Sequence, residues 1–262
     1  MNNYIVVADI GNTNIHIGLV NCASRSILSL DVFPTKEAEK RCAESITSLL
    51  LSMKHAMPIP VVICCVVKSL EARLREVLPN VIEGMIQWVS YTPSLPIVVN
   101  YENTARFGVD RLANLIYGHK VFKGQNLIII DAGTAIKIDY LKAGREFLGG
   151  VIFPGISTQL KSLNEHTAEL PLVDIAEVGF EFPGLSTKAC ILNGVRLGAA
   201  GAISFIVEKY RHYFNEPSLI LSTGGSWKNI QDQIDFEFQF IPELTLVGCA
   251  FFHGIAFSGT LQ

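Results

Sequence analysis

The chain has 262 residues, 49% of them hydrophobic, which allows one large domain or two of medium size around a substantial core. Its 21 basic and 24 acidic side chains give a net charge of −3, so the sequence lacks the basic footprint expected of a nucleic-acid-binding protein. The six cysteines form no C-x-x-C pair and no apolar run reaches about 18 residues, so we expect buried thiols in a reducing cytosol and neither a signal peptide nor a membrane span.

The first half of the chain contains apolar runs separated by turn residues, which predict five strands and three helices. The strands are expected at 4–10, 14–20, about 26–33, 61–67 and about 86–90. The helices are expected at 36–54, at 69–78 and after Gly108. The strand at 61–67 is apolar throughout, as expected for a strand covered on both faces. Residues 91–107 are expected to form an extended loop.

The second half repeats this pattern after a short connection at 118–126. Its strands are expected at 127–131, 135–141, 146–153, 218–222 and about 236–240. Its helices are expected from Pro154, at 186–213 and at 244–257, with a loop at 170–185. The order β-β-β-α-β-α-β recurs approximately in both halves, which indicates a duplicated domain.

Two of the strand-to-strand turns share the same chemistry. Each places an aspartate at a strand end, followed by a glycine and a threonine: Asp9-Ile-Gly11-Asn12-Thr13 and Asp131-Ala-Gly133-Thr134. Glycine lets the backbone approach a phosphate closely, and a carboxylate can hold a cation. Either turn alone could be a structural hairpin, but the pair favours phosphate groups held between two similar halves. Neither a Walker loop nor a Rossmann fingerprint occurs.

Three further constellations each leave two interpretations open. Asp110 beside Arg111 near a helix start suits a general base with a carboxylate-binding guanidinium, or an ordinary surface pair. The segment 149–155 either presents a helix N-terminus to an anion or makes a tight strand-to-helix turn. The glycines at 224–225 either press on a flat ligand such as adenine or form a simple loop. The histidines show no spacing typical of metal ligands. His166, which follows the helix expected from Pro154, could nevertheless reach the same cleft as the segment 149–155.

Five motifs occur in order along the chain: Asp9-Ile-Gly-Asn-Thr13, Gly108-Val-Asp-Arg111, Asp131-Ala-Gly-Thr-Ala135, Gly149-Gly-x-Ile-x-Pro-Gly155 and Thr167-Ala-x-Leu-Pro171. Together they resemble the type III pantothenate kinase family, within the superfamily of acetate and sugar kinases and actin. The resemblance implies an α/β fold of two tandem RNase H-like (actin-like ATPase) domains with a cleft between them. The domains are expected at 1–118 and 119–262.

The resemblance also implies an activity: ATP-dependent phosphorylation of pantothenate, the first step of coenzyme A biosynthesis, in a cytoplasmic homodimer. Asp110 would be the general base. Pantothenate would be bound by Tyr101, Gly108, Arg111 and Thr187, the last from the partner half of the site. The ATP phosphates and Mg²⁺ would be faced by Asp9, Gly11, Asn12, Thr13 and Thr134. Asp131 would hold a monovalent cation, K⁺ or NH₄⁺.

The sequence departs from the family pattern at two places. Lys137 stands where threonine is common, and it could pair with a phosphate or point to solvent. The residues after Tyr101 are Glu-Asn-Thr, where an Asp-Pro or Asn-Pro pair is common. Two other functions stay open: a phosphohydrolase of the same superfamily, which the arginine beside the base disfavours, and a nucleotide-binding regulatory protein without kinase activity.

Overall fold

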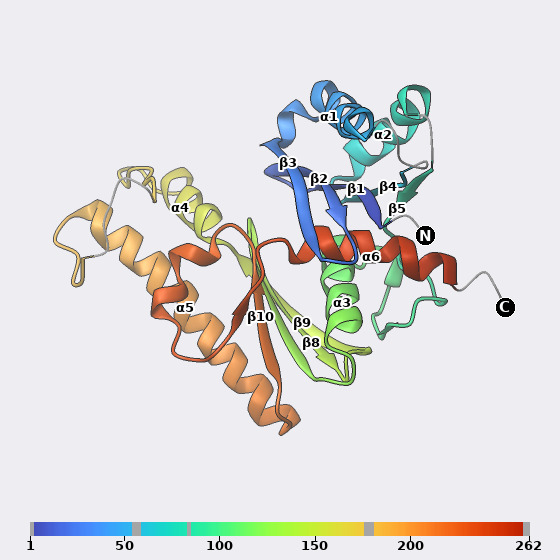
Figure 1. Cartoon of the computed structure of the whole chain (residues 1–262). Coiled ribbons are helices and arrows are strands. Elements are labelled where there is room, and N and C mark those ends of the chain that lie inside the picture. The colour runs from blue at the N-terminus through green and yellow to red at the C-terminus, as the bar shows by residue number, and fades with distance from the viewer. Residues whose placement is uncertain (1–2, 54–58, 83–84, 176–180, 259–262) are drawn as a thin grey trace. The chain divides into compact units, whose positions relative to one another are not determined.

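The computed structural model describes residues 3–53, 59–82, 85–175 and 181–258 (Figure 1). By its internal contacts the chain divides into two compact units. Unit 1 comprises Met1–Gly124, Leu141–Leu148 and Glu243–Gln262, and unit 2 comprises Gln125–Tyr140 and Gly149–Pro242. The units do not coincide with the predicted division after residue 118, because the terminal helix α6 (Leu244–Ser258) packs on α3 (Val109–Val121) of unit 1.

Unit 1 is built on a five-stranded sheet with the strand order β3-β2-β1-β4-β5. The strands are β1 (Tyr4–Ile10), β2 (Asn14–Asn21), β3 (Ser26–Pro34), β4 (Val61–Cys65) and β5 (Ile86–Trp88). The first three pair antiparallel through short turns, whereas β4 lies parallel to both β1 and β5. All five occur where the sequence predicts strands, with end shifts of a few residues.

Helices cover both faces of this sheet (Figure 1). Val6, Ala8 and Ile10 alternate along β1 and belong to one core together with residues of α1 (Ala38–Ser52) and α2 (Lys68–Val81). The α3 and α6 helices contact β4 on the other face. Side chains of a strand alternate between faces, so Asp9 points away from the α1 and α2 core. A short 3₁₀ helix, Thr35–Glu37, opens the helix predicted at 36–54, and the predicted end at 54 lies outside the described residues.

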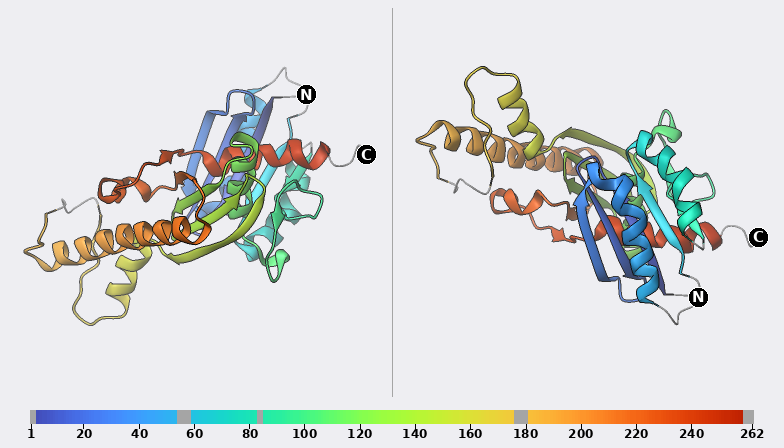
Figure 2. Two further views of the ribbon diagram at one scale, coloured as in Figure 1. Left: turned by 90° about the horizontal axis from the view of Figure 1, so that it is seen from below. Right: turned by 90° about the horizontal axis from the view of Figure 1, so that it is seen from above.

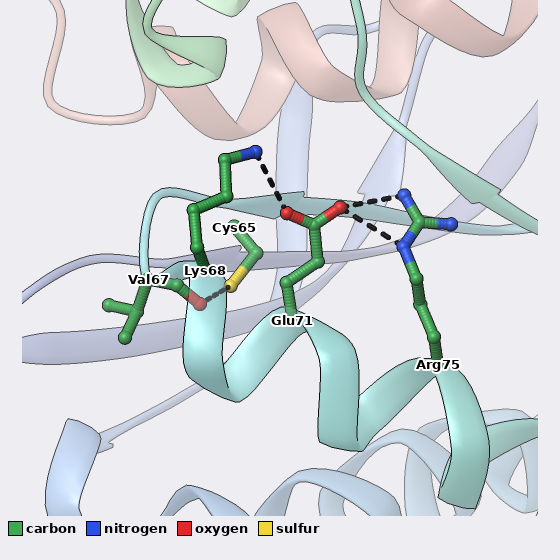
Figure 3. Close-up of polar contacts among 5 residues, drawn as sticks. All are labelled: Cys65, Val67, Lys68, Glu71 and Arg75. Atoms are coloured by element: carbon green, nitrogen blue, oxygen red, sulfur yellow. Dashed lines mark hydrogen bonds and ion pairs between the residues drawn. The ribbon is translucent and has the colours of Figure 1, made fainter. Parts of the chain in front are cut away.

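The start of α2 is fixed by a small polar network (Figure 3). Glu71 accepts hydrogen bonds from Lys68 Nζ at 3.0 Å and from Arg75 Nη2 at 2.7 Å. Partial burial raises the pKa of Glu71, but these two cations and their hydrogen bonds outweigh it and leave that pKa lowered. The Arg75 guanidinium also lies 4.2 Å from the ring centroid of Trp88, which ties α2 to β5. The helix runs past its predicted end at 78 and includes Pro79.

The second sheet has the order β11-β10-β7-β8-β9-β6. Its strands are β6 (Val98–Val99), β7 (Leu127–Ala132), β8 (Ala135–Lys142), β9 (Glu146–Pro154), β10 (Leu219–Thr223) and β11 (Gln239–Phe240). The β10 strand is parallel to β7 and to β11. The two-residue β6 lies inside the predicted loop at 91–107 and pairs with the start of β9 in unit 1. A strand of two residues is too short to produce a recognisable alternation.

The helices of unit 2 are α4 (Ile156–Glu165) and α5 (Thr187–Phe214), which lie side by side (Figure 2). The predicted helix start at Pro154 is wrong, because Pro154 is the last residue of β9 and Gly155 is the N-cap of α4. Short 3₁₀ helices form at Trp227–Asn229 and Gln231–Gln233 in unit 2, and another forms at Thr104–Arg106 in unit 1. Among the described residues, α5 alone is long and apolar enough to cross a membrane by length and composition, and 44% of its most apolar window is buried.

Candidate active site

The first aspartate–glycine turn connects β1 to β2 in unit 1. The Gly11 N–H donates to Asn14 O at 3.0 Å, and a Cβ at Gly11 would lie only 3.0 Å from that oxygen. Thr35 makes two hydrogen bonds to the backbone of this turn. Its hydroxyl donates to Gly11 O at 2.8 Å, and its N–H donates to Thr13 O at 2.9 Å. Asn12 and Thr13 are exposed. Hydrogen bonds therefore fix the backbone of the turn, while its polar side chains are accessible to a ligand.

The second turn connects β7 to β8 in unit 2 and is braced from α4. Thr134 O accepts from the Gly155 N–H at 2.9 Å and from the Thr158 hydroxyl at 2.6 Å. A Cβ at Gly155 would collide with Gly133 O, so only glycine permits this approach. The glycine and proline run that precedes α4 thus serves to seat the turn on the helix start.

Gly224 follows β10 and packs against the same strand end. A Cβ at this position would lie 2.5 Å from Ala132 O, and the φ of Gly224 is +94°. Gly224 is therefore required by packing within unit 2, while a Cβ at Gly225 would meet nothing within 4 Å. The predicted contact of this segment with adenine stays a prediction.

The two turns differ in what lies opposite the aspartate. Asp9 is the register partner of His16, and burial lowers the pKa of that imidazole. In unit 2, Lys137 Nζ lies 2.7 Å from Asp131 Oδ2, and their side chains are 15% and 13% exposed. Lys137 therefore does not point to solvent. An ammonium group therefore already lies on the carboxylate that the sequence predicts to hold a monovalent cation.

Asp110 lies in the first turn of α3, where its Oδ1 accepts a hydrogen bond from the Arg111 N–H at 2.8 Å. A helix N-terminus favours a negative charge because its N–H groups lack helical partners. A Cβ at Gly108 would lie 2.7 Å from Asp110 Oδ1. The absence of a side chain at Gly108 therefore leaves the space that the carboxylate occupies.

Replacing Gly108 by alanine should displace this carboxylate while leaving the helix in place. With Asp110 as the predicted general base, we expect Gly108→Ala to lower kcat about tenfold, since small misplacements of a catalytic group are costly. The KM for ATP should change little. Steady-state kinetics on the variant provide the measurement. The matched control is Gly194→Ala in α5, where the added Cβ would meet nothing within 4 Å; equal losses in both variants would contradict the assigned role of Gly108.

The side chain of Arg111 is enclosed by aromatic rings of unit 1. Its guanidinium carbon lies 4.7 Å from the ring centroid of Phe107, 5.2 Å from that of Phe147 and 5.9 Å from that of Tyr101. Arg111 is 5% exposed, whereas Tyr101 is 45% exposed and forms the outer wall. We call these three rings the aromatic cage. The arrangement holds a buried planar cation against three rings.

The charges of Asp9 and Asp110 both act on the buried thiol of Cys64. Asp9 is the register partner of Cys64 in β4, and Cys249 of α6 lies against the same thiol. The hydrogen bond to Cys249 and burial raise the pKa of Cys64, and the charges of both Asp9 and Asp110 raise it further. Both carboxylates thus act on the same buried thiol, and the assignment of Asp9 and Asp110 to one site stays a prediction.

Thr187 begins α5 and is exposed in unit 2, just after Ser186, whose hydroxyl caps the helix by accepting from the Ala189 N–H at 3.2 Å. Sequence reasoning missed three contributors to the two sites: the rings of Phe107 and Phe147, and the hydroxyl of Thr35. Phe147 is the second residue of β9 and lies 36 positions beyond Arg111, so no local pattern connects the two.

Comparison with known proteins identifies relatives along most of the chain. The sequence model of the type III pantothenate kinase family matches residues 5–209. A type III pantothenate kinase of Chlorobaculum parvum is 30% identical over 240 residues, which cover 87% of this chain and 86% of the relative. One from Chlorobium chlorochromatii is 33% identical over 177 residues, or 66% of each chain.

Solved structures share the fold at low sequence identity. A conserved Baf family transcriptional activator from Campylobacter jejuni has a TM-score of 0.58 at 17% identity, covering 97% of this chain and 98% of that one. A ROK hexokinase from Thermus thermophilus has a TM-score of 0.53 at 16% identity, covering 95% and 97%. These likenesses confirm the predicted actin-like ATPase fold with two RNase H-like domains.

Proposed function

The chain belongs to the type III pantothenate kinase family, and from this premise we propose that Asp110 and Arg111 form the catalytic and pantothenate-binding centre of its active site. The family transfers a phosphate group from ATP to pantothenate, with Mg²⁺, in coenzyme A biosynthesis, and this chain is such a kinase. The observation that carries the residue assignment is the pairing of a carboxylate at a helix start with a caged guanidinium on the next residue.

Asp110 accepts the proton of the pantothenate hydroxyl in this proposal. Phosphoryl transfer has a loose transition state, so that the base chiefly orients the hydroxyl and takes its proton late. Arg111 binds the pantothenate carboxylate through its planar fork, with Tyr101 at the open side of the aromatic cage and Gly108 beside it. Asp110 and Arg111 are neighbours in sequence. Their spacing therefore limits how far apart the hydroxyl and the carboxylate of a substrate can be.

The first turn holds phosphate oxygens through Gly11, Asn12 and Thr13, and Thr134 of the second turn contacts phosphate as well. Mg²⁺ usually binds through one or two carboxylates together with phosphates and waters, and Asp9 at the first turn would supply such a carboxylate. No cluster of three or more acidic, histidine or cysteine ligands occurs within the described ranges, so the donor set suits an ion that arrives with the nucleotide. Asp9 would hold this ion, which would supply charge neutralisation at the phosphates.

A homodimer in the cytoplasm completes the proposal. Thr187, exposed at the start of α5, contacts pantothenate in the partner half of the site. All six cysteines are free thiols, which suits a reducing compartment.

Production of phosphopantothenate from ATP and pantothenate is the direct test. The purified protein with Mg²⁺ should release ADP only when pantothenate is present, in equal amount with phosphopantothenate, as measured by a coupled ADP assay and mass spectrometry. Phosphate release without pantothenate would favour the phosphohydrolase. Binding of ATP without any turnover would favour the regulatory protein, and both outcomes would contradict the proposal.

A further inference from the structure

The second turn carries a cation of its own. Lys137 Nζ lies 2.7 Å from Asp131 Oδ2, which joins the end of β7 to the third residue of β8. Both side chains are largely withdrawn from water, at 15% and 13% exposure. An ion pair of low exposure is screened little by salt, and it stays formed because separation would leave a charge without its partner in a poorly hydrated position.

We propose that the ammonium group of Lys137 replaces the monovalent cation at Asp131, so that nucleotide binding and phosphate transfer by this chain do not depend on potassium. The inference rests on the proposed function, in which the second turn contacts phosphate. An alkylammonium carries the same single charge as K⁺ or NH₄⁺ and donates to a carboxylate oxygen as NH₄⁺ does. Because it is covalently attached, it is present whatever the salt concentration.

The donor set around Asp131 does not fit an additional potassium ion. A monovalent metal ion needs oxygen ligands, and a lysine ammonium has three donors and no acceptor. Threonine, common in the family at position 137, would supply a hydroxyl oxygen instead. A metal ion on the remaining Asp131 oxygen would also lie close to the positive charge of Lys137, and like charges at such a distance repel.

The Lys137 charge is positioned to do what a bound cation would do. A Cβ added at Gly133 would lie 3.7 Å from Asp131 Oδ1, so the carboxylate lies beside the turn. The next residue, Thr134, is exposed, with its carbonyl held by α4. A fixed positive charge beside a phosphate-binding turn offsets part of the phosphate charge.

The test compares potassium chloride with N-methylglucamine chloride at equal ionic strength. The affinity for MgATP is measured by isothermal titration calorimetry, and turnover of pantothenate by the coupled assay. In the wild type, both quantities should agree within about twofold between the two salts. In Lys137→Thr, the ATP affinity should fall about tenfold in N-methylglucamine and recover with potassium, because a hydroxyl and a carboxylate then form a cation site.

Two further variants separate charge from ligation. Lys137→Arg keeps a cation on Asp131 and should remain independent of potassium. Lys137→Met has neither charge nor ligand oxygen and should lose ATP affinity in both salts. Lys142→Thr, at the end of the same strand, is the matched control and should behave as the wild type. Melting temperatures of each variant in both salts show whether it is folded, and potassium should raise that of Lys137→Thr alone.

Two results would overturn the inference. One is an ATP affinity of the wild type that rises about tenfold or more with potassium, and the other is a Lys137→Thr variant, folded by its melting temperature, that binds ATP equally in both salts. The outcome is separable from that of the proposed function. A wild type that binds MgATP but phosphorylates no pantothenate in either salt would refute the kinase assignment, while the calorimetric comparison would still decide the role of Lys137.

Discussion

Replacement of Asp110 by asparagine should lower kcat by about 10²–10⁴-fold, the range expected for loss of a general base. Asparagine keeps the shape of the side chain, and its Oδ1 can still accept the Arg111 N–H bond that Asp110 Oδ1 accepts at 2.8 Å. What is lost is the ability to take a proton from the hydroxyl. The KM values for ATP and pantothenate should therefore stay close to those of the wild type, as determined by steady-state kinetics.

A matched control comes from another aspartate of unit 1. Asp31 pairs with Arg41 at 3.0 Å on the partly exposed β3 strand, and Asp31→Asn should retain nearly full turnover. Calorimetric binding of pantothenate to the Asp110→Asn protein would show that the site is intact. Turnover of that variant within a few-fold of the wild type would exclude Asp110 as the base.

Arg111→Met should reduce kcat/KM for pantothenate by about 10²–10³-fold, since loss of one partner of a buried charge pair costs several kcal/mol. The effect should appear mainly in the KM for pantothenate, because Arg111 is assigned to the substrate carboxylate and not to the transferred phosphate. Arg111→Lys should not restore binding, because lysine lacks both the planar fork and the stacking surface that the aromatic cage holds.

The role of Arg111 can also be tested by changing the substrate. The alcohol analogue of pantothenate has a hydroxyl group in place of the carboxylate. The wild type should strongly prefer pantothenate, and Arg111→Met should discriminate little between the two compounds. Arg41→Met is the matched control, because the Arg41 guanidinium also stacks on a ring, 4.2 Å from the centroid of Phe33, but outside the site. An unchanged preference for pantothenate in folded Arg111→Met would contradict the assignment of Arg111.

Local patterns predicted the backbone well. Nearly every predicted strand and helix occurs, because alternation and apolar runs are properties of short segments. The differences have local causes too: Pro154 favours a helix start by its fixed φ but is equally able to end a strand at a sheet edge. The terminal helix was expected in the second domain, yet it contacts α3 and β1, because the helix packs according to its apolar surface and not according to its place in the chain.

The sequence by itself determined the strand–turn–strand units, the chemistry of the two aspartate–glycine turns and the family to which the chain belongs. Only the tertiary structure decided what each charged side chain meets. It enclosed Arg111 among rings from distant segments and laid the ammonium of Lys137 on Asp131. The physical reason is that backbone conformation depends mostly on neighbouring residues, whereas the partner of a charge depends on which strands and helices pack together. The two turns look alike in sequence, but the aspartate of one is paired in register with a histidine and that of the other carries the ammonium of a lysine.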